Sequence, residues 1–438
     1  MRAISQEGSH CMAPDAFQGV DLRHLAARVG TPFYLYDAQT LHARIATIEA
    51  LTAGPHLQAR YAMKACSASR VLTCMREHGM WIDAVSGNEV LRARAAGYAM
   101  GCEVPEVLLS TDVFRDNALE VIRKHGIVPN IGSPGMVQQL AENGYRGPLG
   151  LRLNPGFGHG HVQSCDTGGP SSKHGIWADN ALAVAEVAER HGMRIVLLHT
   201  HVGSGPTPAE FQANMQHLVT FFAEHITAYP HLQAVNFGGG IPHAYRPGAP
   251  GVDLESFGHL LLEAQARFSQ QMGRAIRVEI EPGRYFVAPA AAVVAQVTDV
   301  KRTQSNTRGA GHTFVMVDAG FCDLVRPAMY GAFHHIGVWN APTDAPLEPV
   351  VVAGPLCESG DVFTRDDAEL LQPRPLPPVQ RGDLILLYDA GAYGSAMSSN
   401  YNSLGRIPQV WLDNGTPYLM SRRETFEDLM RTECFMPL

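Results

Sequence analysis

Short apolar runs alternate with amphipathic stretches over residues 37–287 of this 438-residue chain. The amphipathic stretches, such as SASRVLTCMREHG (67–79) and AEFQANMQHLVTFFAEH (209–225), repeat their apolar residues at three and four positions, which predicts helices. The apolar runs predict strands. They are RYAMKA (60–65), WIDAVS (81–86), VLLST (107–111), VPNIGS (128–133), LGLRLN (149–154), RIVLLHTHVG (194–203), AVNFGGG (234–240) and RVEIEPG (277–283).

Eight strands that alternate with helices over about 250 residues are typical of a (β/α)8 TIM barrel. The alternative is an open doubly wound sheet, which more often has fewer strands and a dinucleotide fingerprint. We therefore predict an α/β fold in which residues 37–287 form the barrel.

A different pattern begins after Val287. Segments such as AAVVAQVTDVKR (291–302) and DLILLYDAGAY (383–393) are rich in β-forming residues and are joined by short turns. They predict a second, mostly antiparallel β domain from residues 1–36 and 288–438. GTPFYLY (30–36) precedes the first barrel helix and is a candidate strand of that domain.

Composition narrows the class of protein. Hydrophobic residues make up 45% and charged residues 17%, as in ordinary globular chains, and the net charge of −8 without a long basic run argues against nucleic acid or a membrane surface as partner. The first residues lack the apolar stretch of a signal peptide, and the longest apolar run, around 286–297, is too short to span a bilayer. Eight scattered cysteines without CxxC pairs indicate reduced thiols, with no metal site. We expect a cytoplasmic protein.

Polar residues gather late in the predicted strands. In a TIM barrel the carboxyl ends of the strands share one face, where active sites are built. This clustering predicts a site formed near Lys64, Asp83, Ser86, Asn130, Ser133, Asn154, His201, the glycine run 238–240 and Glu281.

Lys64 is the first candidate for chemistry. A lysine at the end of an apolar strand is uncommon, although it can also be a rim residue whose ammonium reaches water. A lysine shielded from water in a barrel mouth is more readily neutral, and it can then form an imine with an aldehyde cofactor.

Glycine-rich turns follow three of the later strands. GGG (238–240), HTHVGSG (199–205) and EPGR (281–284) let backbone N–H groups approach an anion, although a glycine run is often only a tight turn. In TIM barrels, phosphate sites tend to lie in the loops after the last two strands, which here are GGG and EPGR.

These features together resemble the fold-type III pyridoxal-phosphate enzymes, the superfamily of alanine racemase and the ornithine and diaminopimelate decarboxylases. YAMKAC (61–66) is similar to their cofactor-lysine motif. HTHVGSG, GGGIP (238–242), EPGRYFV (281–287), GPLCESGDVF (354–363) and DAGAYGSAMSSNYN (389–402) follow in the family's order. The chain looks most like the diaminopimelate decarboxylases, and NPGFGHGHVQSCDTGGPSSKHGIW (154–177) resembles their enterobacterial form.

The resemblance implies pyridoxal 5'-phosphate as the cofactor, held as an imine by the catalytic residue Lys64. His201 would stack on the pyridine ring, although it could also be a histidine packed at a strand end. Glu281 would face the pyridine nitrogen and keep it protonated, which strengthens the electron sink and favours decarboxylation over racemisation. The other implied cofactor contacts are Asp83, Ser204, Gly239, Gly240, Pro282, Gly283, Arg284 and Tyr393.

Cys357 and Glu358 lie outside the barrel, in the β domain. The resemblance implies that the Cys357 thiol returns a proton to Cα, as a catalytic residue, while Glu358 binds the distal ammonium of the substrate. The alternative for Cys357 is a buried structural cysteine. In the family these residues reach the barrel of a second subunit, which implies a homodimer with shared active sites.

Arg326 and Tyr330 are implied to bind a distal carboxylate, with help from Arg284 and Tyr393. A planar guanidinium suits a carboxylate, although Arg326 could instead form a salt bridge at the rim. A site with both Glu358 and Arg326 matches a substrate whose far end carries both an ammonium and a carboxylate. The expected reaction is decarboxylation of meso-2,6-diaminopimelate to L-lysine and CO2.

Two alternatives remain open. One is a related decarboxylase of another diamino acid, such as carboxynorspermidine or a pathway-specific intermediate. The other is a non-catalytic pyridoxal-phosphate-binding homologue, although Lys64, Cys357 and the β domain are all present. The loop 157–173, rich in glycine and polar residues, is a candidate lid over the substrate.

Overall fold

The computed structural model describes residues 17, 19–101, 105–158 and 167–436. The chain divides into two compact units. Residues 44–243 and 250–285 build the first unit. The described residues up to Ala43 join residues 244–249 and those from Phe286 onward in the second.

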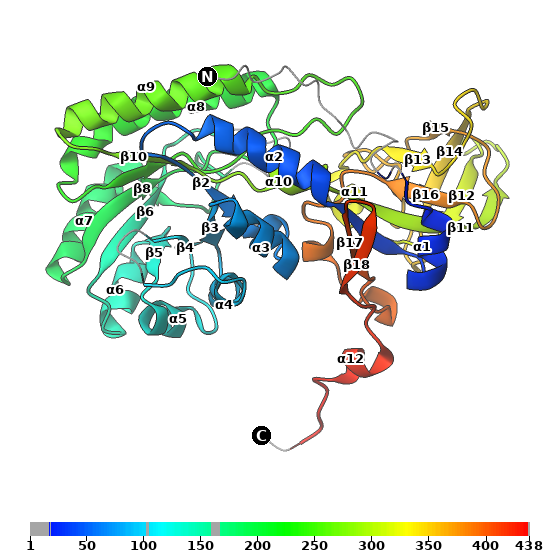
Figure 1. Cartoon of the computed structure of the whole chain (residues 1–438), viewed down its shortest axis with the longest axis horizontal. Coiled ribbons are helices and arrows are strands. Elements are labelled where there is room, and N and C mark those ends of the chain that lie inside the picture. The colour runs from blue at the N-terminus through cyan, green and yellow to red at the C-terminus, as the bar shows by residue number, and fades with distance from the viewer. Residues whose placement is uncertain (1–16, 18, 102–104, 159–166, 437–438) are drawn as a thin grey trace. The chain divides into compact units, whose positions relative to one another are not determined.

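The first unit holds a closed barrel of eight parallel strands (Figure 1). Each strand pairs with the next along the chain, except that the short β7 (Ile176–Trp177) only extends the edge of β6, and β2 pairs with β10 to close the barrel. The predicted TIM barrel is thus confirmed, in preference to an open doubly wound sheet. Its strands are β2 (Leu57–Ala62), β3 (Trp81–Ala84), β4 (Val107–Thr111), β5 (Val128–Ile131), β6 (Pro148–Asn154), β8 (Arg194–His199), β9 (Ala234–Asn236) and β10 (Arg277–Ile280).

Helices follow the strands, as the three-and-four spacing predicted. Local sequence fixes their ends: α8 (Pro208–His225) starts with a capping box between Thr207 and Glu210, and α9 (Leu254–Met272) ends at Gly273 in the left-handed conformation. These two helices pack side by side (Figure 1). The others are α2 (Ala38–Leu51), α3 (Ser69–Glu77), α4 (Gly87–Ala95), α5 (Ala118–His125), α6 (Gly135–Glu142), α7 (Ala181–Arg190) and the short α10 (Arg284–Val287).

Several strands end earlier than their apolar runs. β8 stops at His199, β9 at Asn236 and β10 at Ile280, so the polar residues that follow belong to turns. Gly238 at φ +68° cannot continue a strand, and the N–H of Glu281 donates to its carbonyl at 2.7 Å. The turns after β9 and β10 are therefore tied to each other.

A buried ion pair joins the two strands at the barrel closure. Arg60 on β2 and Glu279 on β10 are 1% and 0% exposed, and they meet through Nε–Oε2 at 2.7 Å and Nη2–Oε1 at 3.1 Å. Arg277 adds a third contact to Glu279 at 2.7 Å, and both arginines lie over the ring of Trp81. Every side of this buried carboxylate is thereby paired.

The second unit is a mostly antiparallel sheet, as predicted. Its longest strand, β11 (Ala291–Arg302), pairs antiparallel with β1 (Phe33–Asp37), β12 (Thr313–Val317) and β16 (Leu384–Leu387). β1 also pairs in parallel with β17 (Gln409–Asp413), which confirms that the segment 30–36 supplies a strand to this sheet. The sheet is completed by β13 (Ile336–Val338), β14 (Glu348–Ala353), β15 (Arg374–Leu376) and β18 (Thr416–Ser421).

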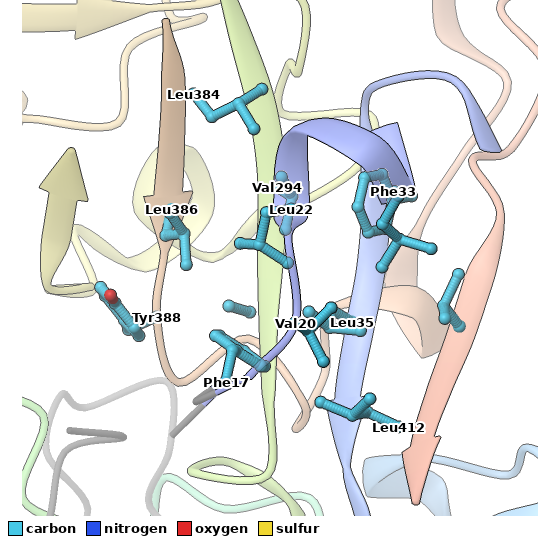
Figure 2. Packing of buried hydrophobic residues seen from close by; sticks show 13 residues of the cluster. Phe17, Val20, Leu22, Phe33, Leu35, Val294, Leu384, Leu386, Tyr388 and Leu412 are labelled. Atoms are coloured by element: carbon cyan, nitrogen blue, oxygen red, sulfur yellow. The ribbon is translucent and has the colours of Figure 1, made fainter. Parts of the chain in front are cut away.

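An apolar cluster covers one face of this sheet (Figure 2). Helix α1 (Leu22–Val29), capped by the Asp21 carboxylate, contributes Leu22 and Leu25 to it. Phe33 and Leu35 of β1 alternate toward the same face, and both are fully buried. The second unit also contains two short helices, α11 (Arg326–Tyr330) and α12 (Phe426–Met430).

Among the residues described, no helix is long and apolar enough to cross a membrane.

We predict that Arg60→Met lowers the free energy of unfolding by about 3–5 kcal/mol, because Glu279 then keeps a buried charge with only part of its compensation. Burial alone would raise the pKa of Glu279, but the charges and hydrogen bonds of Arg60 and Arg277 lower it to about 2. The pair therefore stabilises the fold above the ordinary glutamate pKa and ceases to do so as pH falls toward the folded value. Urea titrations at several pH values test this.

The matched control is Arg70→Met, which removes the exposed pair between Arg70 and Glu77. Its effect should stay below about 1 kcal/mol. Equal losses in the two variants would contradict the importance of the buried pair.

Candidate active site

Lys64 lies in a short 3-10 turn, Met63–Ala65, directly after β2. Met63 and Ala65 are buried on either side, whereas Lys64 itself is exposed, so its ammonium can reach the space at this end of the barrel. The turn packs against the one after β10: the N–H of Ala62 donates to the carbonyl of Pro282 at 3.2 Å. A Cβ at Gly283 would lie 2.9 Å from the carbonyl oxygen of Ala62, so a larger residue could not stand there.

Four predicted or neighbouring site residues lie within reach of the Lys64 charge. It favours the ionised forms of Asp83, Glu89 and Glu281, and it disfavours protonation of His201. The first unit therefore brings Lys64, Asp83, His201 and Glu281 together, as the strand-end pattern predicted.

Asp83 and Glu281 are both buried carboxyls, but they have opposite character. Burial, and then the negative charge of Glu281, raises the pKa of Asp83 to about 8. Burial also opposes ionisation of Glu281, but the electrostatic attraction of the nearby His199 ring, with the charges of Lys64 and Arg60, outweighs it and lowers the pKa of Glu281. Glu281 is therefore the carboxylate of the pair, and Asp83 is the acid that stays protonated near neutral pH.

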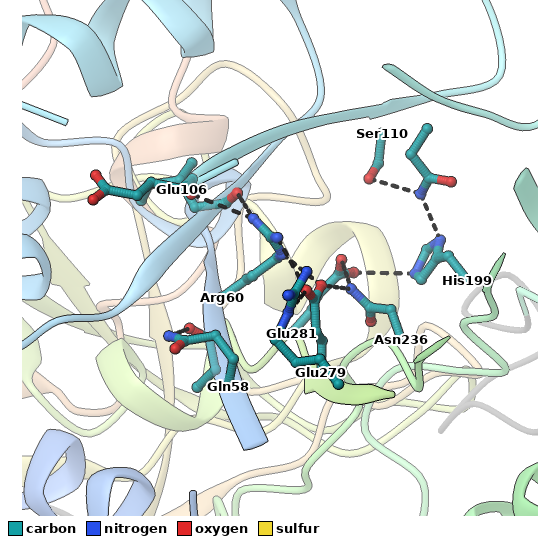
Figure 3. A network of polar contacts seen from close by, with 12 residues as sticks. Gln58, Arg60, Glu106, Ser110, His199, Asn236, Glu279 and Glu281 are labelled. Carbon is teal, nitrogen blue, oxygen red and sulfur yellow. Dashed lines mark hydrogen bonds and ion pairs between the residues drawn. The ribbon is translucent and has the colours of Figure 1, made fainter. Parts of the chain in front are cut away.

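A chain of polar contacts inside the barrel holds Glu281 (Figure 3). Asn236 Nδ2 donates to Glu281 Oε1 at 2.7 Å and also faces Glu279 Oε2 at 3.3 Å. On the other side, His199 Nε2 lies 3.1 Å from Glu281 Oε2. The carboxylate thus has a partner at each oxygen.

The glycine run 238–240 makes a close turn beside His201. The N–H of Gly239 donates to His201 Nδ1 at 3.2 Å, so that nitrogen carries no proton and the ring is neutral. Burial, and then the positive charges of Lys64 and Arg152, lower the pKa of His201 well below its usual value, in agreement with a neutral ring. A Cβ at Gly239 would lie 2.4 Å from the Glu281 carbonyl oxygen, and one at Gly240 would lie 2.5 Å from that of Gly203.

Arg284 and Ser204 meet at the same end of the barrel. Arg284 Nη2 donates to Ser204 Oγ at 3.3 Å, which joins the turn after β8 to helix α10. A hydroxyl, a guanidinium and closely packed glycine backbone are suitable partners for a phosphate group.

These residues fit pyridoxal phosphate. Asp83 Oδ1 is buried and has no hydrogen-bond partner in the described part of the chain. Most buried polar atoms have such a partner, so a bound ligand at this end of the barrel would explain the exception. The glycine turn leaves no room for side chains. The donors Ser204 and Arg284 suit the phosphate, Glu281 suits a protonated ring nitrogen, and Lys64 suits an aldehyde.

Loop 155–175 is anchored near this site at both ends. Asn154 Oδ1 accepts from the N–H groups of Gly156 and Gly169 at 3.0 and 2.8 Å. Asp112 contacts His174 Nδ1 at 2.5 Å and accepts from the N–H of Gly175 at 3.0 Å. Residues 159–166 lie outside the described residues, so the suggested lid at 157–173 stays a prediction.

In the second unit, Arg326 is buried at the start of α11 and held on two sides. Its Nη1 lies 2.8 Å from His334 Nε2, and its guanidinium lies 4.7 Å from the ring centre of Tyr245. His334 Nδ1 lies 2.8 Å from the Tyr388 carbonyl oxygen, to which it can only donate, so Nε2 is the acceptor for Arg326. Arg326 is thus a buried guanidinium that is fixed by contacts on two sides.

The other predicted residues of the second unit are more accessible. Cys357 and Glu358 are exposed, so the alternative of a buried structural cysteine is wrong. The Cys357 N–H donates to Asn402 Oδ1 at 3.0 Å, and Asp361 accepts from the N–H of Leu356 at 2.8 Å, which fixes the loop that presents them. Tyr330 is half-buried at the end of α11.

Tyr393 is also half-buried, and it adopts φ +59°. A non-glycine residue in the left-handed region costs conformational energy, and such residues concentrate at functional sites.

Sequence reasoning missed His199, Asn236 and His334 as site residues. The signal for His199 was available, because it alternates with His201 in the HTH motif. Asn236 carries no local signal, since its role depends on a contact between strands. His334 is close to Arg326 in the sequence, but it meets Arg326 only because the chain turns back after α11.

Comparison with known proteins agrees with this geometry. Residues 39–288 match the family model described as "Pyridoxal-dependent decarboxylase, pyridoxal binding domain". The chain is 40% identical to the diaminopimelate decarboxylase of Escherichia coli K12 over 421 residues, which covers 94% of this chain and 96% of that protein.

Solved structures give the same result. A crystal structure of diaminopimelate decarboxylase is 39% identical with a TM-score of 0.87, covering 95% of this chain and 98% of that one. The enzyme of Helicobacter pylori, crystallised with L-lysine, is 28% identical with a TM-score of 0.81, covering 94% and 98%.

We predict that Asp83→Asn flattens the pH dependence of stability in protein without cofactor. Because the folded pKa of Asp83 is raised to about 8 from 3.8, wild-type stability is highest at low pH and falls as pH rises through this interval, by at most about 1.4 kcal/mol per pH unit. Urea titrations from pH 4 upward measure this, with the exposed Asp179→Asn as control. Parallel curves for wild type and Asp83→Asn would show that Asp83 ionises normally.

Proposed function

The chain belongs to the pyridoxal-dependent decarboxylase family, among the diaminopimelate decarboxylases, and we infer that it converts meso-2,6-diaminopimelate to L-lysine and CO2. This is a carbon–carbon lyase reaction, the last step of lysine synthesis. The carboxylate that leaves is the one on the D-configured carbon. The relatives that match over nearly the whole chain bear this name, and the alternative substrates are not favoured.

The observation that carries this function is Glu281, a buried carboxylate kept ionised beside Lys64. Pyridoxal phosphate, when bound, supplies an electron sink for the pair released as the Cα–carboxylate bond breaks. A carboxylate facing the ring nitrogen keeps that nitrogen protonated and so strengthens the sink. The ionised state of Glu281 therefore supports decarboxylation.

Each residue at the barrel end has a proposed task toward the cofactor. Lys64 would hold the cofactor at its aldehyde carbon. His201, with its neutral ring, would stack on the pyridine face, and protonated Asp83 lies within reach of the Lys64 charge. Backbone and side chains that hold the phosphate and the ring edge are Ser204, Gly239, Gly240, Pro282, Gly283, Arg284 and Tyr393.

The second unit supplies the proposed groups for the substrate. The exposed Cys357 thiol delivers the proton that replaces CO2 at Cα, and Glu358 binds the distal ammonium. Arg326 and Tyr330, with Arg284, bind the distal carboxylate. Lysine lacks that carboxylate and so cannot make this contact with the buried Arg326 guanidinium, which favours diaminopimelate over lysine as the substrate.

We also propose that residues 37–287 function as the cofactor-binding part, and that residues 1–36 and 288–438 contribute to the active site of a second copy. The exposure of Cys357 and Glu358 on a well-anchored loop supports this homodimer. The cytoplasm is the proposed location, and five free cysteines among the described residues support it.

The test of the function is a lysine-detecting assay with purified protein, pyridoxal phosphate and meso-diaminopimelate. Arg326→Ala should lower kcat/KM by at least about 2 kcal/mol in free-energy terms, because a charged hydrogen bond to the distal carboxylate is lost. Lys64→Ala serves as the control without the cofactor lysine, and it should lose the visible absorbance of the bound cofactor as well as turnover. An unchanged kcat/KM in Arg326→Ala would remove the argument for this substrate.

Mixing two inactive variants tests the shared site. If Cys357 of one subunit serves Lys64 of another, dimers of Lys64→Ala with Cys357→Ala contain one complete wild-type site and regain activity. Subunit exchange must be confirmed with tagged chains. Exchanged dimers that stay inactive would mean that each site is built within one chain.

A further inference from the structure

His199 lies at the last position of β8, and only 2% of it is exposed. Its two ring nitrogens face two different side chains. Nε2 lies 3.1 Å from Glu281 Oε2, and Nδ1 lies 2.9 Å from Asn130 Nδ2. His199 is therefore the middle of a buried series that runs from Asn130 on β5 to Glu281 after β10 (Figure 3).

The contacts of Asn130 determine where the His199 proton lies. Asn130 Nδ2 donates to Ser110 Oγ at 3.0 Å, and its second hydrogen points to His199 Nδ1. Nδ1 is then the acceptor, and the proton of the neutral ring lies on Nε2, toward the carboxylate. If the Asn130 amide were turned the other way, its oxygen would accept from Nδ1–H, and Nε2 of a neutral ring would carry a lone pair. That lone pair would face the Glu281 carboxylate, and the two would repel each other. The proton thus belongs on Nε2.

The Nε2–H direction is not aligned for a good hydrogen bond, although the distance is short. Asn236, by contrast, makes a close contact with the other oxygen of Glu281, and its own Oδ1 accepts from the N–H of Gly238 at 2.8 Å. Asn236 fixes where the carboxylate lies, and His199 limits how it can turn. The charged or titratable groups that face Glu281 are His199, Lys64, Arg60 and Asp83.

We propose that His199, oriented by Asn130, is a positioning residue that holds Glu281 as a carboxylate aimed at the ring nitrogen of the cofactor. This rests on the proposed role of Glu281. His199 itself does not contact the reacting atoms; it acts through Glu281. Without it, a buried carboxylate that has lost one of two partners takes up a proton more readily.

Two substitutions separate contact from packing. His199→Gln keeps an amide N–H near the place of Nε2. His199→Asn can place its amide oxygen near Nδ1 but has no atom near Nε2, so it retains the Asn130 contact and loses the contact with Glu281. Loss of a residue that orients a ligand-holding group at metal sites typically costs about 10- to 100-fold in activity. We expect kcat of His199→Asn to fall at least about tenfold with little change in KM, and His199→Gln to recover most of it.

The spectroscopic readout uses holoenzyme loaded with 15N-pyridine-labelled pyridoxal phosphate. The ring nitrogen should be protonated in wild type and His199→Gln, and partly unprotonated in His199→Asn at the same pH. His225→Asn on α8, whose ring contacts the Phe221 carbonyl and ring on its own helix, is the matched control and should behave as wild type. A fully protonated nitrogen in His199→Asn, with wild-type kcat, would overturn the proposal.

A second measurement separates this proposal from the role of Glu281. In protein without cofactor, 13C-carboxyl NMR should show the pKa of Glu281 raised by His199→Asn and not by His199→Gln. If Glu281→Gln leaves the cofactor nitrogen protonated, the proposed function of Glu281 fails, while this titration still reports on His199. An unchanged Glu281 titration in His199→Asn would overturn the positioning role.

The wild-type protein alone provides a third test, in case a variant does not fold. Long-range 1H–15N correlation of histidine-labelled protein should show His199 with its proton on Nε2 and a bare Nδ1. A proton on Nδ1 with a bare Nε2 would overturn the proposal.

Discussion

The site depends on keeping one negative charge inside a protein barrel. A buried carboxylate costs several kcal/mol unless it is paired and hydrogen-bonded. The barrel meets this cost by strand register: His199 of β8, Asn236 of β9 and Glu279 of β10 are directly paired neighbours across three strands. Glu281, two residues beyond Glu279, continues the same face. The order and register of the barrel strands, and not the loops alone, therefore keep the Glu281 carboxylate ionised.

These paired strand residues also connect the buried ion pair of Arg60 and Glu279 inside the barrel with the active-site end at Glu281. Asn236 touches both Glu279, which is neutralised by Arg60, and Glu281. Its side-chain Oδ1 also accepts from the N–H of Gly238 and so holds the glycine turn. The Asn236 side chain thus fixes both the carboxylate expected at the pyridine ring and the backbone expected at the phosphate. One residue therefore positions the groups proposed for the two ends of the cofactor.

Much of this could be predicted from sequence. Apolar runs and helical spacing gave the barrel, and polar strand ends indicated Lys64, Asp83 and Glu281, because strand ends share one face of a barrel. His199 and Asn236 could not be assigned in the same way, since their roles arise from the lateral register of strands far apart in the chain. For the second unit, the sequence predicted Arg326 as a carboxylate ligand but not His334, which meets it only after the chain turns back.

β1 places an unusual demand on how this protein is made. It is synthesised before both of its partners, because it pairs with β11 on one side and with β17, residues 409–413, on the other. The intervening barrel can fold while synthesis continues, because its eight strands and their helices lie between residues 57 and 280. Phe33 and Leu35 are fully buried in the folded protein, but they must remain exposed until the strands that pack against them have been made. An apolar strand that must wait for a partner synthesised much later, such as β17, is a natural client for a chaperone.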